Sequence, residues 1–258
     1  MPELPGRPPT GAPDVPTTPG SPAPLQRSAG LVVAVDGPSG SGKSTLARAV
    51  ATSAGLAYLD TGAMYRAVTW AALDHGLDLA DTAAVAALSR GLDIDVTTDP
   101  AATAVRVAGV DVTEAIRRPG LSAVVSAVAT NLEVRTELVA RQRAVAARGG
   151  VVLEGRDTTT VVAPAADVRI LLTADEATRL ARRAREVRGS DDEAALAATH
   201  AEVLDRDVRD SAVADFTTAA DGVTVIDSSG HTAAQVLAIA LELVRRAGRP
   251  VRDPQVTR

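Results

Sequence analysis

Apolar residues are grouped along the chain in two alternating patterns. Short apolar runs typical of buried strands stand at residues 31–36, 57–59, 151–154, 168–172 and 223–226. Apolar residues at helical spacing predict helices at residues 43–54, from residue 61, at 81–91, 121–130 and 133–148, from 175 to a break at 189–190, at 191–210 and at 232–247. Strands that alternate with helices favour an α/β fold with a mostly parallel sheet of about five strands.

The apolar period changes between residues 92 and 107. Leu92, Ile94 and Val96 alternate with polar residues, and Val105 and Val107 flank Arg106 in the same way. This alternation predicts a small antiparallel sheet, which interrupts the α/β pattern as an insertion.

The two ends of the chain differ in composition from the rest. Residues 1–29 hold nine of the fifteen prolines, which predicts a disordered, partly extended tail. A proline-rich ligand for a binding module is the alternative interpretation. Residues 248–258 are expected to form a frayed tail, and no internal repeat is found in the sequence.

Composition and charge narrow the class of protein. Apolar residues make up 46% of the chain but aromatic residues only 2%, so ligand recognition must rest on hydrogen bonds rather than on stacking. A net charge of −5 argues against a nucleic-acid or acidic-membrane partner. The chain has no cysteine and no apolar run of the ~18 residues that a membrane span needs, and its N-terminal stretch lacks the apolar core of a signal peptide. We expect a soluble cytoplasmic monomer.

A phosphate-binding loop follows the first predicted strand. Gly37, Gly42, Lys43 and Ser44 occupy the fixed positions of the pattern G-x-x-x-x-G-K-[ST]. Such a loop turns backbone N–H groups inward around phosphates, its lysine reaches the outer phosphates, and its serine hydroxyl binds Mg²⁺. Lys43 is the single lysine of the chain, and a compact ammonium suits this role better than a guanidinium. The alternative is a glycine-rich turn without function.

Several polar and charged residues lie at the carboxyl ends of predicted strands, where open α/β sheets bind ligands. Thr61 is a candidate N-cap for the second helix, and Arg66 lies one turn further on, near the carboxyl edge of the sheet. An ordinary surface arginine is the alternative for Arg66. Asp36 and Glu154 end strands beside the phosphate-binding loop, so one of them is a candidate for contact with Mg²⁺ through water.

Four segments together resemble the bacterial cytidylate kinase family of nucleoside monophosphate kinases. They are VDGPSGSGKST at residues 35–45, DTGAMYR at 60–66, EGRD at 154–157 and RDVRDS at 206–211. The stretch GVDVTEAIR at 109–117 also resembles that family's insertion. The first segment alone indicates only a phosphate-binding loop, whereas DTGAMYR together with GRD makes the resemblance specific.

The resemblance implies a three-layer P-loop NTPase-type fold with a small α+β insertion and a short helical lid. The kinase domain would span residues 30–247, with its core at 30–60, 150–178 and 222–247. The insertion that binds the nucleoside monophosphate would span about 61–148, and the lid about 179–211.

The resemblance also implies roles for individual residues. Catalysis would involve Lys43, Arg156 and Arg206. ATP would be bound by Gly37, Pro38, Ser39, Gly40, Ser41, Gly42, Lys43, Ser44 and Thr45, with Ser44 on Mg²⁺. The α-phosphate of CMP would be held by Arg66 and Arg156, the cytosine edge read by Ser126, Arg135 and Asp157, and the sugar contacted by Thr61, Arg206 and Asp210. The closing lid would carry Arg179, Arg182 and Arg183.

Simpler interpretations exist for some of these residues. Arg206 and Asp210 are four positions apart on a helix and could form a surface ion pair of little value. The arginines at 179, 182, 183 and 185 could form a solvated face. The three histidines are expected on the surface, without a catalytic role.

The chain departs from the family pattern in two places. Thr158, Thr159 and Thr160 stand where the family has an apolar residue, glycine and threonine. After Ser211 the chain continues directly with AVADF, as though two residues including a phosphate-binding arginine were absent. Arg209 is a candidate substitute.

Three functions are compatible with the sequence. The first is phosphorylation of CMP, and of dCMP, by ATP with Mg²⁺. The second is a P-loop kinase of another small acceptor. The third is a weakly active homologue that binds nucleotides with little turnover, which the absent arginine motivates.

Overall fold

A computed structural model of the protein describes residues 30–248. The predicted tail at residues 1–29 lies outside the described residues, as does the predicted C-terminal tail apart from Gly248. Within the described range, seven side chains are also outside the description: those of Pro119, Ser122, Ala201, Glu202, Leu204, Asp205 and Arg206.

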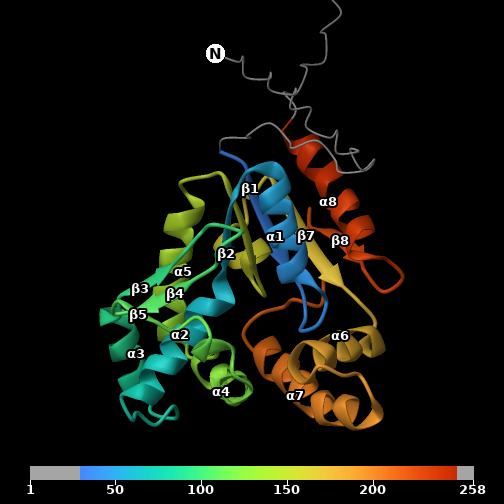
Figure 1. Cartoon of the computed structure of the whole chain (residues 1–258). Helices are drawn as coiled ribbons and strands as arrows, with labels where there is room; N and C mark the ends of the chain where they lie inside the picture. The colour runs from blue at the N-terminus through green and yellow to red at the C-terminus, as the bar shows by residue number, and fades with distance from the viewer. Residues whose placement is uncertain (1–29, 249–258) are drawn as a thin grey trace, which may run out of the picture.

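A parallel five-stranded sheet forms the centre of the protein (Figure 1). Its strands are β1 (Val32–Asp36), β2 (Ala57–Asp60), β6 (Val151–Gly155), β7 (Val168–Thr173) and β8 (Thr224–Asp227). They lie in the order β2-β6-β1-β7-β8, and every neighbouring pair is parallel. The predicted α/β fold and its mostly parallel sheet are confirmed. Because parallel strands end at one edge, β2 and β6 bring the carboxylates of Asp60 and Glu154 together there, while Asp36 ends β1 beside Gly155 of β6.

Helices cover both faces of this sheet. Val33 and Val35 point to α1 (Lys43–Ala54) and α8 (Ala233–Ala247), with which they share one buried apolar cluster. Ala34, the residue between them, belongs instead to a cluster with residues of α5 (Leu132–Ala146). Alternate residues of a strand face opposite ways, so the central strand is apolar throughout and the protein has three layers.

A second group of elements lies beside the sheet, on the left in Figure 1. It consists of α2 (Thr61–Asp74), α3 (Thr82–Gly91), β3 (Ile94–Val96), β4 (Val105–Val107), β5 (Val110–Asp111), η1 (Ala115–Arg117) and α4 (Pro119–Ala129), together with α5. The predicted antiparallel sheet is confirmed, in the order β3-β4-β5. Its third strand was not predicted, because β5 has two exposed residues and no apolar alternation.

Two antiparallel helices, α6 (Glu176–Arg188) and α7 (Glu193–Ser211), form a pair below the sheet edge in Figure 1. The carboxylates of Asp175 and Asp192 cap their first turns, and Gly189, with a φ of 73°, ends α6. These are the helices predicted from residues 175 and 191. The division of the chain into core, insertion and lid stays a prediction. None of the helices in residues 30–248 is both long and apolar enough to cross a membrane.

The predicted N-cap of α2 was wrong. Asp60, not Thr61, caps this helix: its Oδ1 accepts a hydrogen bond of 2.9 Å from the N–H of Ala63. Thr61 is the first helical residue, and its hydroxyl donates to the carbonyl oxygen of Glu154 at 2.8 Å. The parallel pairing of Asp60 with Glu154 extends β2 by one residue, which places the carboxylate of Asp60 at the cap.

Candidate functional site

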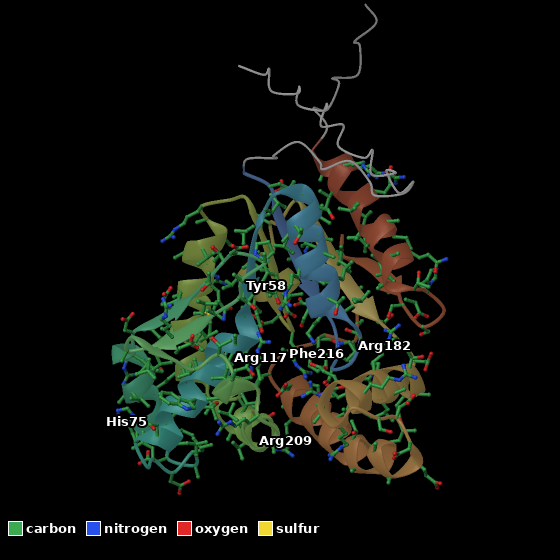
Figure 2. The ribbon with its side chains drawn as sticks, viewed as in Figure 1. Tyr58, His75, Arg117, Arg182, Arg209 and Phe216 are labelled. Carbon is green, nitrogen blue, oxygen red and sulfur yellow. The ribbon has the colours of Figure 1, made fainter. Side chains whose placement is uncertain are left out.

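A cavity of about 710 Å³ opens at the carboxyl edge of the sheet. Its wall combines the loop after β1, the start of α2, residues of α4 and α5, the end of β6, and the helices α6 and α7. In Figure 2, Arg117, Phe216 and Arg182 lie around this region, whereas His75 lies at the outer end of α2. Segments far apart in the sequence therefore contribute to one space.

Most of the residues predicted from the sequence line this cavity. Those from the phosphate-binding loop are Ser39, Gly40, Gly42, Lys43, Ser44 and Thr45. Those expected to contact the acceptor or to belong to the lid are Thr61, Arg66, Arg135, Arg156, Asp157, Asp210, Arg182 and Arg183. The predicted residues that stand behind its wall are Gly37, Pro38, Ser41, Ser126 and Arg179. The side chain of Arg206 lies outside the described residues.

The phosphate-binding loop has the conformation that its glycines allow. Gly42 adopts a left-handed φ of 91° directly before α1, so that Lys43 is the first residue of the helix. The Lys43 ammonium folds back over the loop and donates to the carbonyl oxygen of Pro38 at 3.4 Å. A positive charge and a helix N-terminus thus face the same part of the cavity, an arrangement that binds anions.

Helix α6 lies directly against this loop. A Cβ on Gly40 would stand 2.4 Å from the carbonyl oxygen of Arg179, so only glycine allows the helix to approach this closely. The guanidinium of Arg179 donates to the carbonyl oxygen of Ser39 at 3.1 Å, and that of Arg182 donates to the carbonyl oxygen of Ser41 at 3.2 Å. These two arginines face the loop rather than solvent.

The arginines of α6 therefore differ in their surroundings. Arg183 lines the cavity and pairs with Glu186 at 3.0 Å. Arg185 is 62% exposed and pairs with Asp191 on the outside. The interpretation as a solvated face holds for Arg185 and is wrong for Arg179.

Asp207 joins the loop, the end of β6 and helix α6, and the sequence alone did not single it out. Its Oδ1 accepts from the Arg156 guanidinium at 2.8 Å and from the Ser39 N–H at 3.3 Å, and its Oδ2 accepts from Arg179 at 2.5 Å. Burial alone would raise the pKa of Asp207, but the charge of Arg156 and these hydrogen bonds outweigh it and hold that pKa below its ordinary value. A signal was available, because Asp207 belongs to the RDVRDS segment.

Arg156 contacts two carboxylates and an aromatic ring. Besides Asp207 it contacts Asp210, with 2.9 Å between Nε and Oδ2. Its guanidinium lies over the ring of Phe216, 4.4 Å from the ring centroid. Phe216, the single phenylalanine of the chain, is fully buried. It comes five residues after Ser211, so the segment after α7 places an aromatic ring beneath Arg156.

The interpretation of Asp210 as one half of a surface ion pair with Arg206 is wrong, because Asp210 is buried. This carboxylate is 6% exposed, contacts Arg156, and accepts a hydrogen bond of 2.8 Å from the hydroxyl of Ser126. Ser126 thus links α4 to α7. Arg209 is exposed and donates to the carbonyl oxygen of Ala123 at 3.5 Å. It does not line the cavity, so the structure does not support it as the substitute for the absent arginine.

A buried acidic pair stands behind the loop, between β2 and β6. Asp60 accepts from Arg66 at 2.6 Å, and the side chain of Arg66 is 17% exposed, so Arg66 is not a surface arginine. Burial would raise the pKa of Asp60, but Arg66 outweighs it and lowers that pKa. Glu154 accepts from the Tyr58 hydroxyl at 3.0 Å, and burial together with the charge of Asp60 raises the pKa of Glu154.

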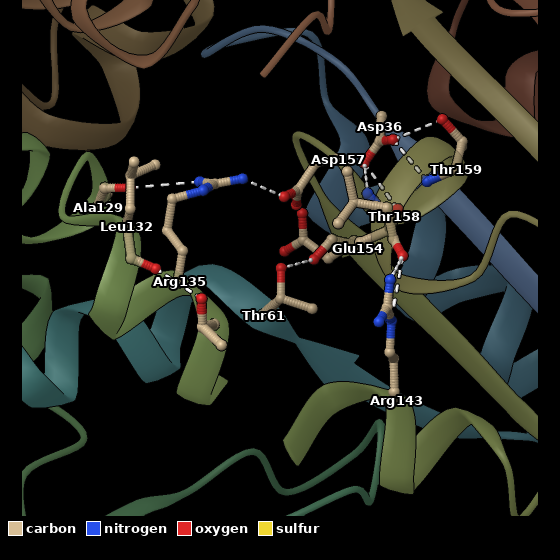
Figure 3. Close-up of polar contacts among 12 residues, drawn as sticks. Asp36, Thr61, Ala129, Leu132, Arg135, Arg143, Glu154, Asp157, Thr158 and Thr159 are labelled. Carbon is tan, nitrogen blue, oxygen red and sulfur yellow. Dashed lines mark hydrogen bonds and ion pairs between the residues drawn. The ribbon is translucent and has the colours of Figure 1, made fainter. Parts of the chain in front are cut away.

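Arg135 of α5 and Asp157, which follows β6, form an ion pair in the wall of the cavity (Figure 3). Arg135 also donates to the carbonyl oxygen of Ala129 at 3.2 Å. Burial raises the pKa of Asp157, although the charge of Arg135 opposes this shift. The pair presents a carboxylate acceptor and a guanidinium donor side by side, which suits the edge of a base with both kinds of partner.

Asp36 and Glu154 differ as candidates for contact with Mg²⁺. Glu154 lines the cavity together with Ser44, whereas Asp36 does not line it. Both carboxylate oxygens of Asp36 accept hydrogen bonds from Thr158 and Thr159 (Figure 3). The interpretation of Asp36 as a contact for the ion is therefore not supported.

The chain is similar to known cytidylate kinases over most of its length. A family model described as cytidylate kinase matches residues 33–246. The cytidylate kinase of Cutibacterium acnes is 48% identical over 218 residues, which cover 83% of this chain and 96% of that protein. Those of Corynebacterium glutamicum and Streptomyces avermitilis are 45% and 43% identical, each over 217 residues, 83% of this chain and 94% and 92% of theirs.

Proposed function

The chain belongs to the cytidylate kinase family, and from this we propose that it transfers the terminal phosphoryl group of ATP to CMP, and to dCMP, giving ADP and the nucleoside diphosphate. One observation carries the proposal: a single cavity joins the phosphate-binding loop to the Arg135–Asp157 pair. A donor triphosphate on the loop and an acceptor read by this pair would share that space.

The cations of the cavity suit phosphoryl transfer, which needs charge stabilisation and little covalent help. Lys43 and the start of α1 would hold the triphosphate of ATP. Arg66 and Arg156 would hold the phosphate of the acceptor opposite them, and Arg182 and Arg183 would close on the transferring group. Asp207 and Phe216 would keep the Arg156 guanidinium in place for this contact.

The residues around Ser44 fit a magnesium ion bound together with the substrate phosphates. Mg²⁺ prefers oxygen ligands and keeps several waters, so it needs only one or two protein oxygens. Ser44 and Glu154 supply a hydroxyl and a carboxylate on the same wall of the cavity. No group of three or more acidic or histidine side chains suited to a metal is found in residues 30–248. When bound, the ion would neutralise charge on the phosphates.

Base recognition would rest on Asp157 and Arg135. Ser126 would act only indirectly, since its hydroxyl contacts Asp210, the partner of Arg156. A carboxylate accepts from the amino group of cytosine, and Arg135 donates to the ring acceptors. Uracil would place a carbonyl against the carboxylate, and such a polar mismatch discriminates strongly. We further propose that the enzyme is a monomer that acts on small nucleotides. We place it in the cytoplasm, because ATP and nucleoside monophosphates occur there.

A panel of acceptors at saturating ATP and Mg²⁺ tests the proposal. ADP release is followed with CMP, dCMP, UMP and AMP, and nucleotide binding is measured by calorimetry. Turnover with CMP but not with UMP or AMP supports the proposal. Turnover with a different acceptor favours a kinase of that nucleotide, and binding without turnover favours the weakly active homologue.

For Asp157→Ala we expect a selective loss of activity with CMP, so that the ratio of kcat/KM for CMP over UMP falls at least about tenfold. The carboxylate that accepts from the cytosine amino group is removed, whereas uracil loses no partner. Steady-state kinetics with both nucleotides measure this ratio.

Asp157→Asn is the matched variant, because an amide can also donate to the uracil carbonyl. We expect it to gain activity with UMP relative to Asp157→Ala. Equal losses with CMP and UMP in Asp157→Ala would contradict the base-reading role.

A further inference from the structure

Asp36 takes part in a compact buried network with the turn that follows Asp157. Its Oδ1 accepts from the N–H and the hydroxyl of Thr158, at 2.9 and 2.7 Å. Its Oδ2 accepts from the N–H and the hydroxyl of Thr159, both at 2.7 Å. Asp36 and the two threonines are at most 4% exposed. Each carboxylate oxygen therefore has two donors, and water contributes little to this network.

The two ends of the network differ in how they are held. Asp36 ends the central strand β1, where it pairs with Gly155 of β6 on one side and with Leu171 of β7 on the other. Thr158 and Thr159 lie in η2 (Thr158–Val162), a single π-helical turn outside the sheet. Because Asp36 belongs to the sheet, its carboxylate is the fixed end of the network. The hydrogen bonds from Thr158 and Thr159 to this carboxylate therefore hold η2 in place.

The π-helical turn η2 also holds the backbone of Asp157 in place. The carbonyl oxygen of Asp157 accepts from the N–H groups of Val161 and Val162 at 2.8 and 3.1 Å. On the side-chain side, Asp157 is held by Arg135 (Figure 3). A shift of the turn would therefore move the backbone of Asp157, and of Arg156 before it, relative to Arg135.

We propose that Asp36, Thr158 and Thr159 form a positioning clamp that sets where Arg156 and Asp157 meet the acceptor nucleotide, and so governs affinity and base selectivity on the acceptor side. The inference rests on the proposed function. All three are positioning residues: none of them lines the cavity.

The threonine hydroxyls supply half of the hydrogen bonds in the clamp. Backbone N–H groups supply two of the four hydrogen bonds, and an apolar residue and glycine at these positions would supply no others. The two hydroxyls complete the set of donors to a buried carboxylate, and hydrogen bonds to charged groups are the stronger ones. Thr160, the third threonine of the run, is exposed and takes no part in this network.

The double variant Thr158→Val/Thr159→Val tests the clamp, because valine keeps the shape of threonine and removes only the hydroxyl. We expect the KM for CMP to rise and the ratio of kcat/KM for CMP over UMP to fall, each by about tenfold, because small misplacements of binding groups are costly. The KM for ATP should change less than about twofold, because the loop is positioned by β1 and α1, which keep their own hydrogen bonds.

Two further variants separate positioning from stability. Thr160→Val, the matched control, should match the wild type in all three parameters. Thr158→Ser/Thr159→Ser restores the hydroxyls and should recover most of the acceptor affinity and selectivity. Thermal unfolding of each variant sets an assay temperature at which all of them are folded.

Unchanged acceptor KM and selectivity in the folded double valine variant would overturn the clamp, as would an equal rise in the KM for ATP or a failure of the serine variant to recover. The proposed function is judged separately, from the wild type alone. If the wild type uses another acceptor, the KM comparison is made with that acceptor. If it turns over none, calorimetric Kd values for CMP and UMP take the place of KM and selectivity.

Discussion

Lys43→Ala is expected to lower kcat at least about a hundredfold, the size of effect seen when one group that stabilises transition-state charge is removed. The ammonium lies over the loop at the N-terminus of α1, where the charge of a triphosphate would have to be balanced. The variant should remain folded, because the Lys43 side chain is only partly buried and belongs to none of the apolar clusters.

Coupled measurement of ADP release gives kcat, and circular dichroism checks the fold. Lys43→Arg is the informative companion variant: it keeps the charge, but a planar guanidinium is larger than the ammonium and presents its donors differently. We expect it to recover only part of the activity. Near-normal turnover by Lys43→Ala would show that the catalytic assignment of Lys43 is wrong.

Arg156→Met is expected to lower kcat/KM for CMP by about a hundredfold, with both a higher KM for CMP and a lower kcat. Methionine keeps much of the length of the side chain and can pack on Phe216, but it removes the planar charged fork that suits a phosphate. Asp207 would keep Arg179 as a partner, and Asp210 would keep Ser126. The fold should therefore persist while acceptor binding fails.

Arg185→Met is the matched control, since Arg185 forms an exposed ion pair with Asp191 on the outer side of α6. Exposed pairs contribute little, so its kinetics should equal those of the wild type. Calorimetry with CMP, together with steady-state kinetics, distinguishes lost binding from lost turnover. Equal kinetics for Arg156→Met and Arg185→Met would contradict the role of Arg156.

Local patterns were enough to predict most elements of the fold. The predicted helix at 43–54 matches α1 residue for residue, because a glycine stands at each end and both adopt left-handed φ angles. The strands of the central sheet were found because each is a short apolar run. The turn η2 and the strand β5 were missed, since neither has the apolar period of a helix or a strand.

Some residues of the candidate site were predicted and others were missed, because only those within a recognisable motif or family pattern have a signal in the sequence. Apart from Gly37, Pro38 and Ser41, the predicted loop residues line one cavity together with Arg66, Arg135 and Asp157. Motif spacing identified these residues except Arg135, which the family resemblance implied. Neither gave a sign that Phe216 lies beneath Arg156 or that Asp207 bridges two arginines. A motif can mark a residue such as Asp207 as a candidate, but it does not show which partner that residue meets in the fold.

The sequence by itself determined the order of strands and helices, the phosphate-binding loop and the family resemblance, because these depend on residues close to one another along the chain. Only the tertiary structure decided the partners of the charged groups. Asp36 meets Thr158 across 122 positions, and Asp207 meets the loop at Ser39 across 168. The first contact exists because the parallel strands β1 and β6 bring their carboxyl ends to one edge, and the second because helix α7 carries Asp207 to the loop. Buried charges must find partners there, and the pairing is chosen by packing rather than by local pattern.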